Sequence, residues 1–331
     1  MEVMELAAPG AAASRPLRAA SRPDPKPGPG EVRLKVEACA VCRTDLQISS
    51  GDLRAKLLPI VPGHQIVGRV LEVGEGVSAE LIGRRLGVGW LASTCGGCDL
   101  CLSSRENLCR SATFTGWDRD GGFATQVVVR ADYAQPLAET GNPVELAPLI
   151  CGGIIGYRAF RLTGLGRGDR LGLYGFGASA LLVAQLALRQ GCQLFVVTRG
   201  LAARERAREL GAEWVGEPGQ TPPRPLQGAI TFAPAGAVVV EALSALDRGG
   251  TCVVNAIHLD RIPEFSYDRL YWERRLVSVA NFTRQDSAEF LQLAQRIPIR
   301  TLVETFPLAE ANAALVELEG DRIQGAAVLV P

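Results

Sequence analysis

Residues 170–199, "RLGLYGFGASALLVAQLALRQGCQLFVVTR", contain a candidate strand, a glycine turn, a candidate helix and a second strand. Residues 171–188 carry no charge and are about long enough to span a membrane. Their glycines, however, cluster in the first half, and the apolar residues take a helical spacing only in the second half. We therefore interpret this segment as a buried strand, a tight turn and a buried helix.

The turn reads "GFGASA", a G-x-G-x-x-A pattern that follows an apolar strand and opens a helix. In that context Gly175 makes the turn, Gly177 lets a pyrophosphate approach the backbone, and Ala180 lets the helix pack closely on the strand. The pattern predicts a Rossmann domain that binds a nicotinamide cofactor. The predicted cofactor-binding residues are Gly175, Gly177, Ala178, Thr198 and Arg199.

The end of the second strand bears on the choice of cofactor. An enzyme that uses NAD(H) normally carries Asp or Glu there, about twenty residues after the glycine motif. Here the strand ends in Thr198 and Arg199, and the first acid is Glu205 in the following helix. A hydroxyl and a guanidinium suit a 2′-phosphate, so we expect NADP(H) to be favoured over NAD(H). The alternative is that Arg199 stacks on the adenine and tolerates either cofactor.

Strands and helices alternate from residue 170 to about 280, which predicts a parallel sheet covered on both faces. Before residue 148, short β-branched runs between turn signals predict irregular, mostly antiparallel β structure. The tail contains one helix and a final strand, which we expect to return to the first domain. The predicted fold class is α/β, an irregular mainly-β domain (1–147 and 298–331) plus a doubly wound Rossmann sheet (148–297).

The composition narrows the function classes. Thirty-five basic residues balance thirty-five acidic ones, so the chain has no net positive charge that would attract nucleic acid or an anionic membrane. The N-terminal "MEVMELAAPG" lacks the basic start and apolar core of a signal peptide, and we expect a soluble, cytoplasmic protein. In such a compartment thiols stay reduced, so nine cysteines suggest metal binding before disulfides.

Four of the cysteines form a C-x2-C-x2-C-x7-C array in "CGGCDLCLSSRENLC", within a lobe at 90–112. Short gaps aim successive thiolates inward, and four thiolates leave no open coordination position on a zinc ion. The array therefore predicts a structural zinc held by Cys95, Cys98, Cys101 and Cys109.

Further motifs accompany this array: "CRTD" at 42–45, "GHQIVG" at 63–68, "DGGFA" at 120–124 and the late cysteine of "PLICGGIIGYRAF". Together, and in this order, they resemble the zinc-dependent alcohol dehydrogenases of the medium-chain dehydrogenase/reductase superfamily over nearly the whole chain. The resemblance implies a GroES-like first domain and a reversible hydride transfer between a primary alcohol or aldehyde and NADP(H) or NAD(H). The substrate would be a small-molecule alcohol or aldehyde.

The resemblance also implies roles for particular residues. Thr44 would take up the proton of the alcohol, and Asp45 would fix the ring of the ligand histidine through its second nitrogen. Arg43 would contact the cofactor pyrophosphate. The catalytic zinc would be held by the Cys2His set established for alcohol dehydrogenase, here Cys42, His64 and Cys151.

Three positions depart from the family pattern. Gln47 stands where many relatives have a histidine that relays the proton, and glutamine does not titrate near neutral pH. The proton would then leave through the cofactor ribose and solvent. Gln65 replaces a usual glutamate, and Ala326 stands where many relatives have an arginine for the cofactor phosphates.

The substrate pocket is expected to include Trp90 and Leu53, where Leu53 replaces a second tryptophan and leaves room for bulkier alcohols. A polyol or secondary-alcohol dehydrogenase, and a non-turnover protein that binds NADPH and zinc, are the alternatives. The apolar strand "RLVSVAN" at 275–281 could pair with a symmetry mate, which predicts a homodimer or homotetramer. His258 receives no role, since a place near the nicotinamide and a place in a loop fit equally well.

Overall fold

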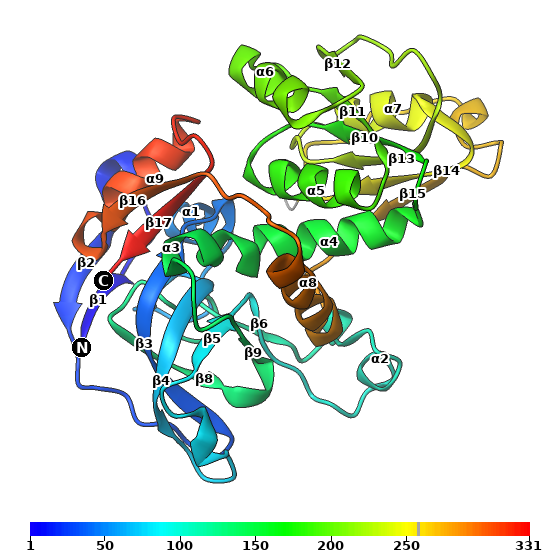
Figure 1. Cartoon of the computed structure of the whole chain (residues 1–331). Coiled ribbons are helices and arrows are strands. Elements are labelled where there is room, and N and C mark those ends of the chain that lie inside the picture. The colour runs from blue at the N-terminus through cyan, green and yellow to red at the C-terminus, as the bar shows by residue number, and fades with distance from the viewer. Residues whose placement is uncertain (257–258) are drawn as a thin grey trace. The chain divides into compact units, whose positions relative to one another are not determined.

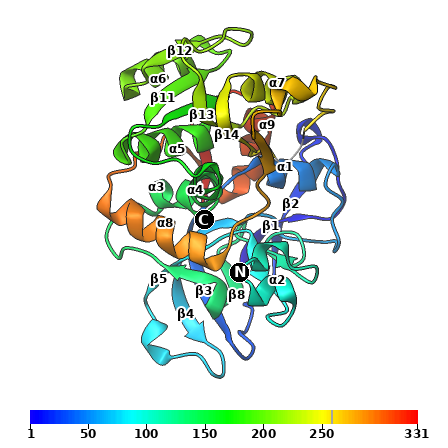
Figure 2. The ribbon, with the colours of Figure 1, turned by 90° about the vertical axis from the view of Figure 1, so that its right-hand side faces the viewer.

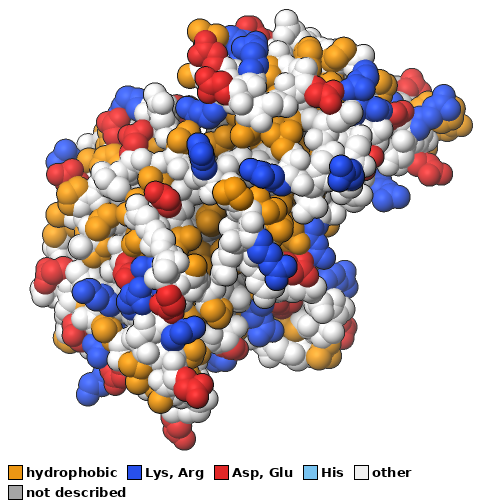
Figure 3. Space-filling view, in the orientation of Figure 1, with side chains coloured by type: hydrophobic (Ala, Val, Ile, Leu, Met, Phe, Trp, Pro, Cys, Tyr) orange, Lys and Arg blue, Asp and Glu red, His pale blue; other side chains and the backbone are white. Residues whose placement is uncertain are grey.

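The computed structural model describes residues 1–256 and 259–331, so His258 lies outside the described residues. Contacts between residues divide the chain into two units (Figure 1). Unit 1 comprises Met1–Cys151, Asn281–Gln295 and Arg300–Pro331, and unit 2 comprises Gly152–Ala280 and Arg296–Ile299. On the face shown in Figure 3, side chains of both charge signs are interspersed, in line with the balanced composition.

Unit 2 is built on a six-stranded parallel sheet with the order β12-β11-β10-β13-β14-β15. These strands are β10 (Arg170–Tyr174), β11 (Gln193–Val197), β12 (Trp214–Gly216), β13 (Leu226–Thr231), β14 (Leu246–Val254) and β15 (Arg275–Ser278). Its helices are α4 (Gly152–Thr163), α5 (Ala178–Arg189), α6 (Leu201–Leu210) and α7 (Gly236–Ser244). Helices α4 and α5 pack together on one face of the sheet, and α7 covers the other (Figures 1 and 2). The predicted doubly wound Rossmann sheet is confirmed.

The apolar segment 171–188 divides as its pattern indicates. Its first residues form β10, where Leu171 and Leu173 are fully buried, and the chain turns at Gly175 with φ +93° before α5 begins at Ala178. Among the described residues, no helix is long and apolar enough to cross a membrane.

Unit 1 contains a seven-stranded sheet in which β3 pairs with β4, β8 and β17. All its pairings are antiparallel except that of β16 with β17. The strands are β3 (Glu31–Ala40), β4 (Gln65–Val73), β5 (Arg85–Val88), β8 (Gln126–Arg130), β9 (Ala134–Pro136), β16 (Val303–Pro307) and β17 (Ala326–Val330). Two small sheets join β1 (Glu2–Leu6) with β2 (Leu17–Ser21) and β6 (Leu91–Ser93) with β7 (Thr113–Phe114).

The helices of unit 1 lie around this β structure: α1 (Arg43–Ser50), α2 (Asp99–Leu102), α3 (Pro143–Leu146), α8 (Arg284–Arg296) and α9 (Ala311–Glu319). The last strand of the chain, β17, pairs with β3 at Val328↔Ala40 and Leu329↔Cys39. The end of the chain therefore supports the segment that leads into Cys42.

Three segments are placed differently from the sequence prediction. Residues 148–151, predicted in the Rossmann domain, belong to unit 1, and residues 298–299, predicted in the first domain, belong to unit 2. The third segment is longer. Residues 281–295 were assigned to the Rossmann domain at 148–297, but they belong to unit 1. The reason is tertiary: Asn281 Nδ2 donates to the Asn107 carbonyl at 3.3 Å, and the Arg284 backbone N–H donates to Glu106 Oε1 at 3.0 Å. Helix α8 and strand β16 also have no counterpart in the predicted elements.

Candidate metal centres and cofactor site

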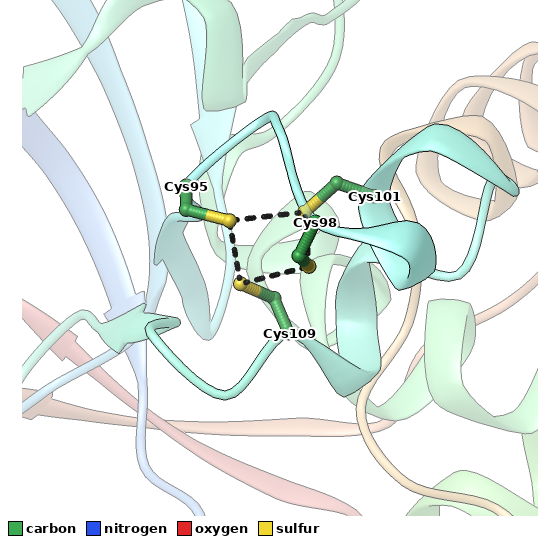
Figure 4. Close-up of side chains that lie close together, drawn as sticks. All are labelled: Cys95, Cys98, Cys101 and Cys109. Carbon is green, nitrogen blue, oxygen red and sulfur yellow. Dashed lines mark hydrogen bonds between the residues drawn. The ribbon is translucent and has the colours of Figure 1, made fainter.

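Four cysteine side chains of unit 1 converge on one point (Figure 4). The Sγ–Sγ distances are 3.9 Å for Cys95–Cys101, 3.5 Å for Cys98–Cys101, 3.9 Å for Cys98–Cys109 and 3.5 Å for Cys95–Cys109. A regular tetrahedron of sulfurs about 2.3 Å from a zinc ion has edges of about 3.8 Å. The four thiols therefore fit a closed, four-coordinate zinc site.

Backbone hydrogen bonds make one thiol of this group, that of Cys95, more acidic. Backbone N–H groups of Gly97 and Cys98 point at the Cys95 sulfur and lower the pKa of Cys95 to about 6. A thiol with this pKa is largely thiolate at neutral pH, and the thiolate is the form that binds metal. All four cysteines are free of disulfides.

A second group brings together residues that are far apart in sequence. Cys42, His64 and Cys151 place their ligand atoms within 4.8 Å of one another. Cys42 is the N-cap of α1, His64 precedes β4, and Cys151 follows the short 3-10 helix Ala147–Ile150. Two thiols and one imidazole are zinc donors, and three protein ligands leave a fourth position open.

The turn before His64 requires glycine. Gly63 has φ +100°, and a Cβ at this position would lie 2.5 Å from the Phe123 ring and 2.9 Å from Cys39 Sγ. A side chain there would displace the buried ring and with it the approach of His64 to the other two ligands.

The carboxylate of Asp45 holds the ligand segments together. Its Oδ1 lies 3.0 Å from His64 Nδ1 and accepts from the Gly63 N–H at 3.1 Å, while Oδ2 accepts from the Cys42 N–H at 2.8 Å. Asp45 is fully buried, and His64 is 1% exposed. With Nδ1 engaged by Asp45, the other ring nitrogen of His64, Nε2, is the one available to a metal.

The electrostatics of this group favour exchange of protons for a cation. Burial opposes charge on His64, but the Asp45 charge and hydrogen bond outweigh it and raise the pKa of His64 to about 10. A hydrogen bond from Cys151, together with His64, holds the pKa of Cys42 well below its usual range in spite of burial. A divalent cation can take the place of these shared protons.

The remaining predicted residues of this region lie on α1. Thr44 is 4% exposed, and its N–H points at Cys42 Sγ. The Oε1 atom of Gln47 is buried and has no hydrogen-bond partner among the described residues. Arg43 forms an ion pair with Asp321, between α9 and β17, but both side chains are largely exposed, and such pairs contribute little free energy.

Aromatic side chains surround the predicted pocket residue Trp90. The His64 ring meets Trp90 edge-on at a centroid distance of 4.9 Å, and Trp90 stacks with Phe114 at 5.1 Å and Trp117 at 6.0 Å. Leu53 packs against the same core as Trp90 and Trp117. The sequence analysis did not single out Phe114 and Trp117, although the aromatic spacing in "FTGW" was a usable signal.

Apart from Arg43, which lies on α1 in unit 1, the predicted cofactor residues lie in unit 2, where β10 and β11 end. Gly175 has φ +93°, and a Cβ there would lie 3.0 Å from the Ala233 N, whereas a Cβ on Gly177 would meet nothing within 4 Å. The open space at Gly177, which caps α5, allows a phosphate to approach the helix N-terminus. Thr198 is 9% exposed, while Arg199 is exposed and forms no ion pair with any described residue.

Comparisons with known proteins agree with this arrangement. Residues 28–139 match the alcohol dehydrogenase GroES-like domain family. The chain is 44% identical to a probable alcohol dehydrogenase, AdhA, of Mycobacterium tuberculosis, over 100% of this chain and 97% of that protein. It is 33% identical to an alcohol dehydrogenase of Geobacillus stearothermophilus, over 95% of this chain and 96% of that protein.

Among solved structures, the fold resembles that of a cobalt- and zinc-bound thermostable alcohol dehydrogenase from Pyrobaculum aerophilum. The TM-score is 0.90, with 24% identity, and the match covers 100% of this chain and 99% of that one.

The two candidate metal groups should respond differently to mutation. Zinc analysis should find two ions per chain. Cys42→Ser or Cys151→Ser should abolish turnover and leave the fold, whereas Cys95→Ser or Cys109→Ser should lower the free energy of unfolding by more than about 2 kcal/mol, because a structural metal contributes folding energy. Fully active protein with one zinc ion or none would contradict this.

Proposed function

The chain belongs to the zinc-dependent alcohol dehydrogenases of the medium-chain dehydrogenase/reductase superfamily, and on that basis we propose that it interconverts primary alcohols and aldehydes with NADP(H) preferred. In this proposal each chain holds two zinc ions, a catalytic one at Cys42, His64 and Cys151 and a structural one at the four-cysteine lobe. The observation that carries it is the three-ligand group with one open position, organised by Asp45.

Zinc bound at the three-ligand group would lower the pKa of an alcohol hydroxyl and so favour loss of its proton. The Thr44 hydroxyl, two residues after Cys42 in the first turn of α1, is the protein group proposed to accept that proton. Asp45 keeps the His64 ring in one orientation and tautomer throughout, because its own carboxylate is held by the Cys42 and Gly63 N–H groups. The alcohol carbon would then give its hydride to the nicotinamide.

Gln47 sets how the proton leaves. Its buried Oε1, which has no hydrogen-bond partner in the described part of the chain, can accept a hydrogen bond from a cofactor ribose hydroxyl, which would satisfy an otherwise costly buried acceptor. An amide does not titrate near neutral pH, so the proton would pass from Thr44 to the ribose and on to solvent.

Residues of the protein are proposed to contact both the pyrophosphate and the 2′-phosphate of the cofactor. Arg43 would exchange its exposed partner Asp321 for the pyrophosphate, which offers bidentate acceptors. In unit 2, the backbone at Gly177 leaves room for a phosphate at the N-terminus of α5. Arg199, exposed and without an ion pair among the described residues, would bind the 2′-phosphate beside the Thr198 hydroxyl.

The substrate side is proposed to be apolar and roomy. The stack of Trp90, Phe114 and Trp117 beside His64 offers flat apolar surfaces, and Leu53 packs against the same core with a smaller side chain than tryptophan. Aromatic rings and long alkyl chains gain from such surfaces, while ethanol cannot fill them.

An alcohol series tests the substrate proposal. Catalytic efficiency should be higher for benzyl and longer primary alcohols than for ethanol, and Leu53→Trp should lower it for the bulky substrates by about tenfold while ethanol changes little. Steady-state kinetics with secondary alcohols and polyols in the same series separate the alternative enzymes. Highest efficiency with ethanol would refute the roomy site, and no turnover with any alcohol or aldehyde would refute the proposed reaction.

A charge reversal tests the cofactor preference. Arg199→Asp should raise the Michaelis constant for NADP(H) by about ten- to a hundredfold and improve the use of NAD(H), because a carboxylate repels a 2′-phosphate and accepts from ribose hydroxyls. Arg208→Asp, an exposed change near the end of the following helix α6, is the matched control and should shift neither constant. Equal or better efficiency of the unmutated enzyme with NAD(H) would contradict the preference.

The proposed oligomer would form through the edge of the unit 2 sheet. Within residues 1–256 and 259–331, strand β15 pairs only with β14, and exposed aromatic side chains precede it. Trp272 is 44% exposed with the Arg248 guanidinium 3.7 Å from its ring centre, and Tyr271 is 56% exposed. A strand edge beside apolar surface suits pairing with a second copy of the chain.

Sedimentation should therefore give the mass of a dimer or tetramer for the unmutated protein. Tyr271→Glu with Trp272→Glu should shift it toward the monomer, since charge would have to be buried in the interface. Leu201→Glu, at an exposed position of α6, should have no effect on mass. An unmutated protein that sediments as a monomer at micromolar concentration would contradict the proposed interface.

A further inference from the structure

Helix α8 begins on the four-cysteine lobe. Glu106, between Cys101 and Cys109, is 7% exposed, and its Oε1 accepts from the Arg284 backbone N–H at 3.0 Å. The Arg284 Nε lies 3.6 Å from the same oxygen. The neighbouring Asn107 carbonyl accepts from Asn281 Nδ2 at 3.3 Å. The lobe thus holds both ends of the turn 281–284.

The residue inside that turn, Phe282, reaches the segment of a proposed zinc ligand. Phe282 is 5% exposed, and a Cβ on Gly89 would lie 2.6 Å from its Cζ and 3.1 Å from the Ile150 carbonyl oxygen. The Phe282 ring and the Ile150 carbonyl therefore both lie close to the same glycine. Ile150 directly precedes Cys151, and Gly89 directly precedes Trp90.

Helix α8 has a second cap that does not involve the lobe. Asp286 Oδ2 accepts from the Thr283 N–H at 2.9 Å and from the Thr283 hydroxyl at 2.8 Å, and the Thr283 hydroxyl accepts from the Asp286 N–H at 3.0 Å. This reciprocal pair satisfies the first turn locally. Loss of Glu106 should consequently detach the helix from the lobe without unfolding the helix.

We propose that Glu106 is a positioning residue for Cys151. By holding the turn 281–284 on the four-cysteine lobe, it keeps Phe282 in place, and Phe282 in turn helps to fix the position of Ile150 and Cys151. Because Cys151 is the ligand with the least support from Asp45, its placement depends on this packing. The inference rests on the proposed function, because it assumes that the four-cysteine lobe and the three-ligand group each hold a zinc ion.

The test is the rate at which a chelator, pyridylazoresorcinol, removes zinc from the holoenzyme. The unmutated protein should release zinc in two phases, and Cys151→Ser identifies the phase that belongs to the three-ligand group by removing it. Glu106→Ala should speed that phase about tenfold, the factor expected for the loss of one charge-assisted hydrogen bond. The phase of the four-cysteine group should change by less than about twofold, because its own thiolates remain.

A double-mutant cycle shows whether the effect passes through the lobe. Cys95→Ser alone should also speed release from the three-ligand group, and adding Glu106→Ala should give no further acceleration, because both changes break the same connection. Hydrogen exchange at residues 148–151 should rise in either variant. The inference would be overturned if the accelerations of zinc release by Cys95→Ser and Glu106→Ala multiplied in the double variant, or if Glu106→Ala alone left the release rate unchanged.

Glu31→Ala is the matched control. Glu31 is likewise a partly buried carboxylate of unit 1 that accepts from a backbone N–H, that of Gly28 at 3.0 Å, and pairs with an arginine, Arg119. Glu31→Ala should leave both phases of zinc release unchanged. If it sped zinc release as much as Glu106→Ala, the effect would be one of general destabilisation, and the inference would be overturned. A single release phase in the unmutated protein would contradict the two-zinc proposal as well.

Discussion

The buried carboxylate of Asp45 is the interaction on which the site depends. A charge removed from water must be matched by donors, and Asp45 is matched by the Cys42 N–H, the Gly63 N–H and the His64 ring. These donors belong to two of the three ligand segments, so the requirement to satisfy one charge fixes the separation of Cys42 and His64. The same bonds cap α1 and thereby place Thr44 and Gln47.

The fold supplies this carboxylate with its partners. β3 and β4 pair along their length and bring the segments before α1 and after Gly63 together, while β17 covers the end of β3. Cys151 belongs to a third segment, which forms no hydrogen bond to Asp45 within the described residues. It follows a 3-10 helix whose last residue, Ile150, is buried beside Gly87. The site thus joins a rigid pair of ligands to a third whose position depends on side-chain packing.

Much of this could be predicted from local sequence. The Rossmann sheet, the turn at Gly175 and the grouping of the four cysteines follow from spacing within short segments, where the chain itself brings the residues together. Contacts made only in the folded chain gave no such signal. Residues 281–295 join unit 1 through Glu106 and Asn107, and Arg43 pairs with Asp321, in both cases between segments that are distant in sequence. The spacing of "FTGW" was a usable signal for Phe114 and Trp117 as aromatic neighbours, but not for their stacking on Trp90.

The most direct test of the central claim is zinc X-ray absorption on the unmutated protein and on Cys151→Ser. If Cys42, His64 and Cys151 hold a second metal, the unmutated protein should show sulfur near about 2.3 Å together with nitrogen at about 2.0–2.1 Å. Cys151→Ser should then give zinc surrounded by sulfur alone, because only the group of Cys95, Cys98, Cys101 and Cys109 stays fully liganded. An all-sulfur environment already in the active, unmutated protein would contradict the account.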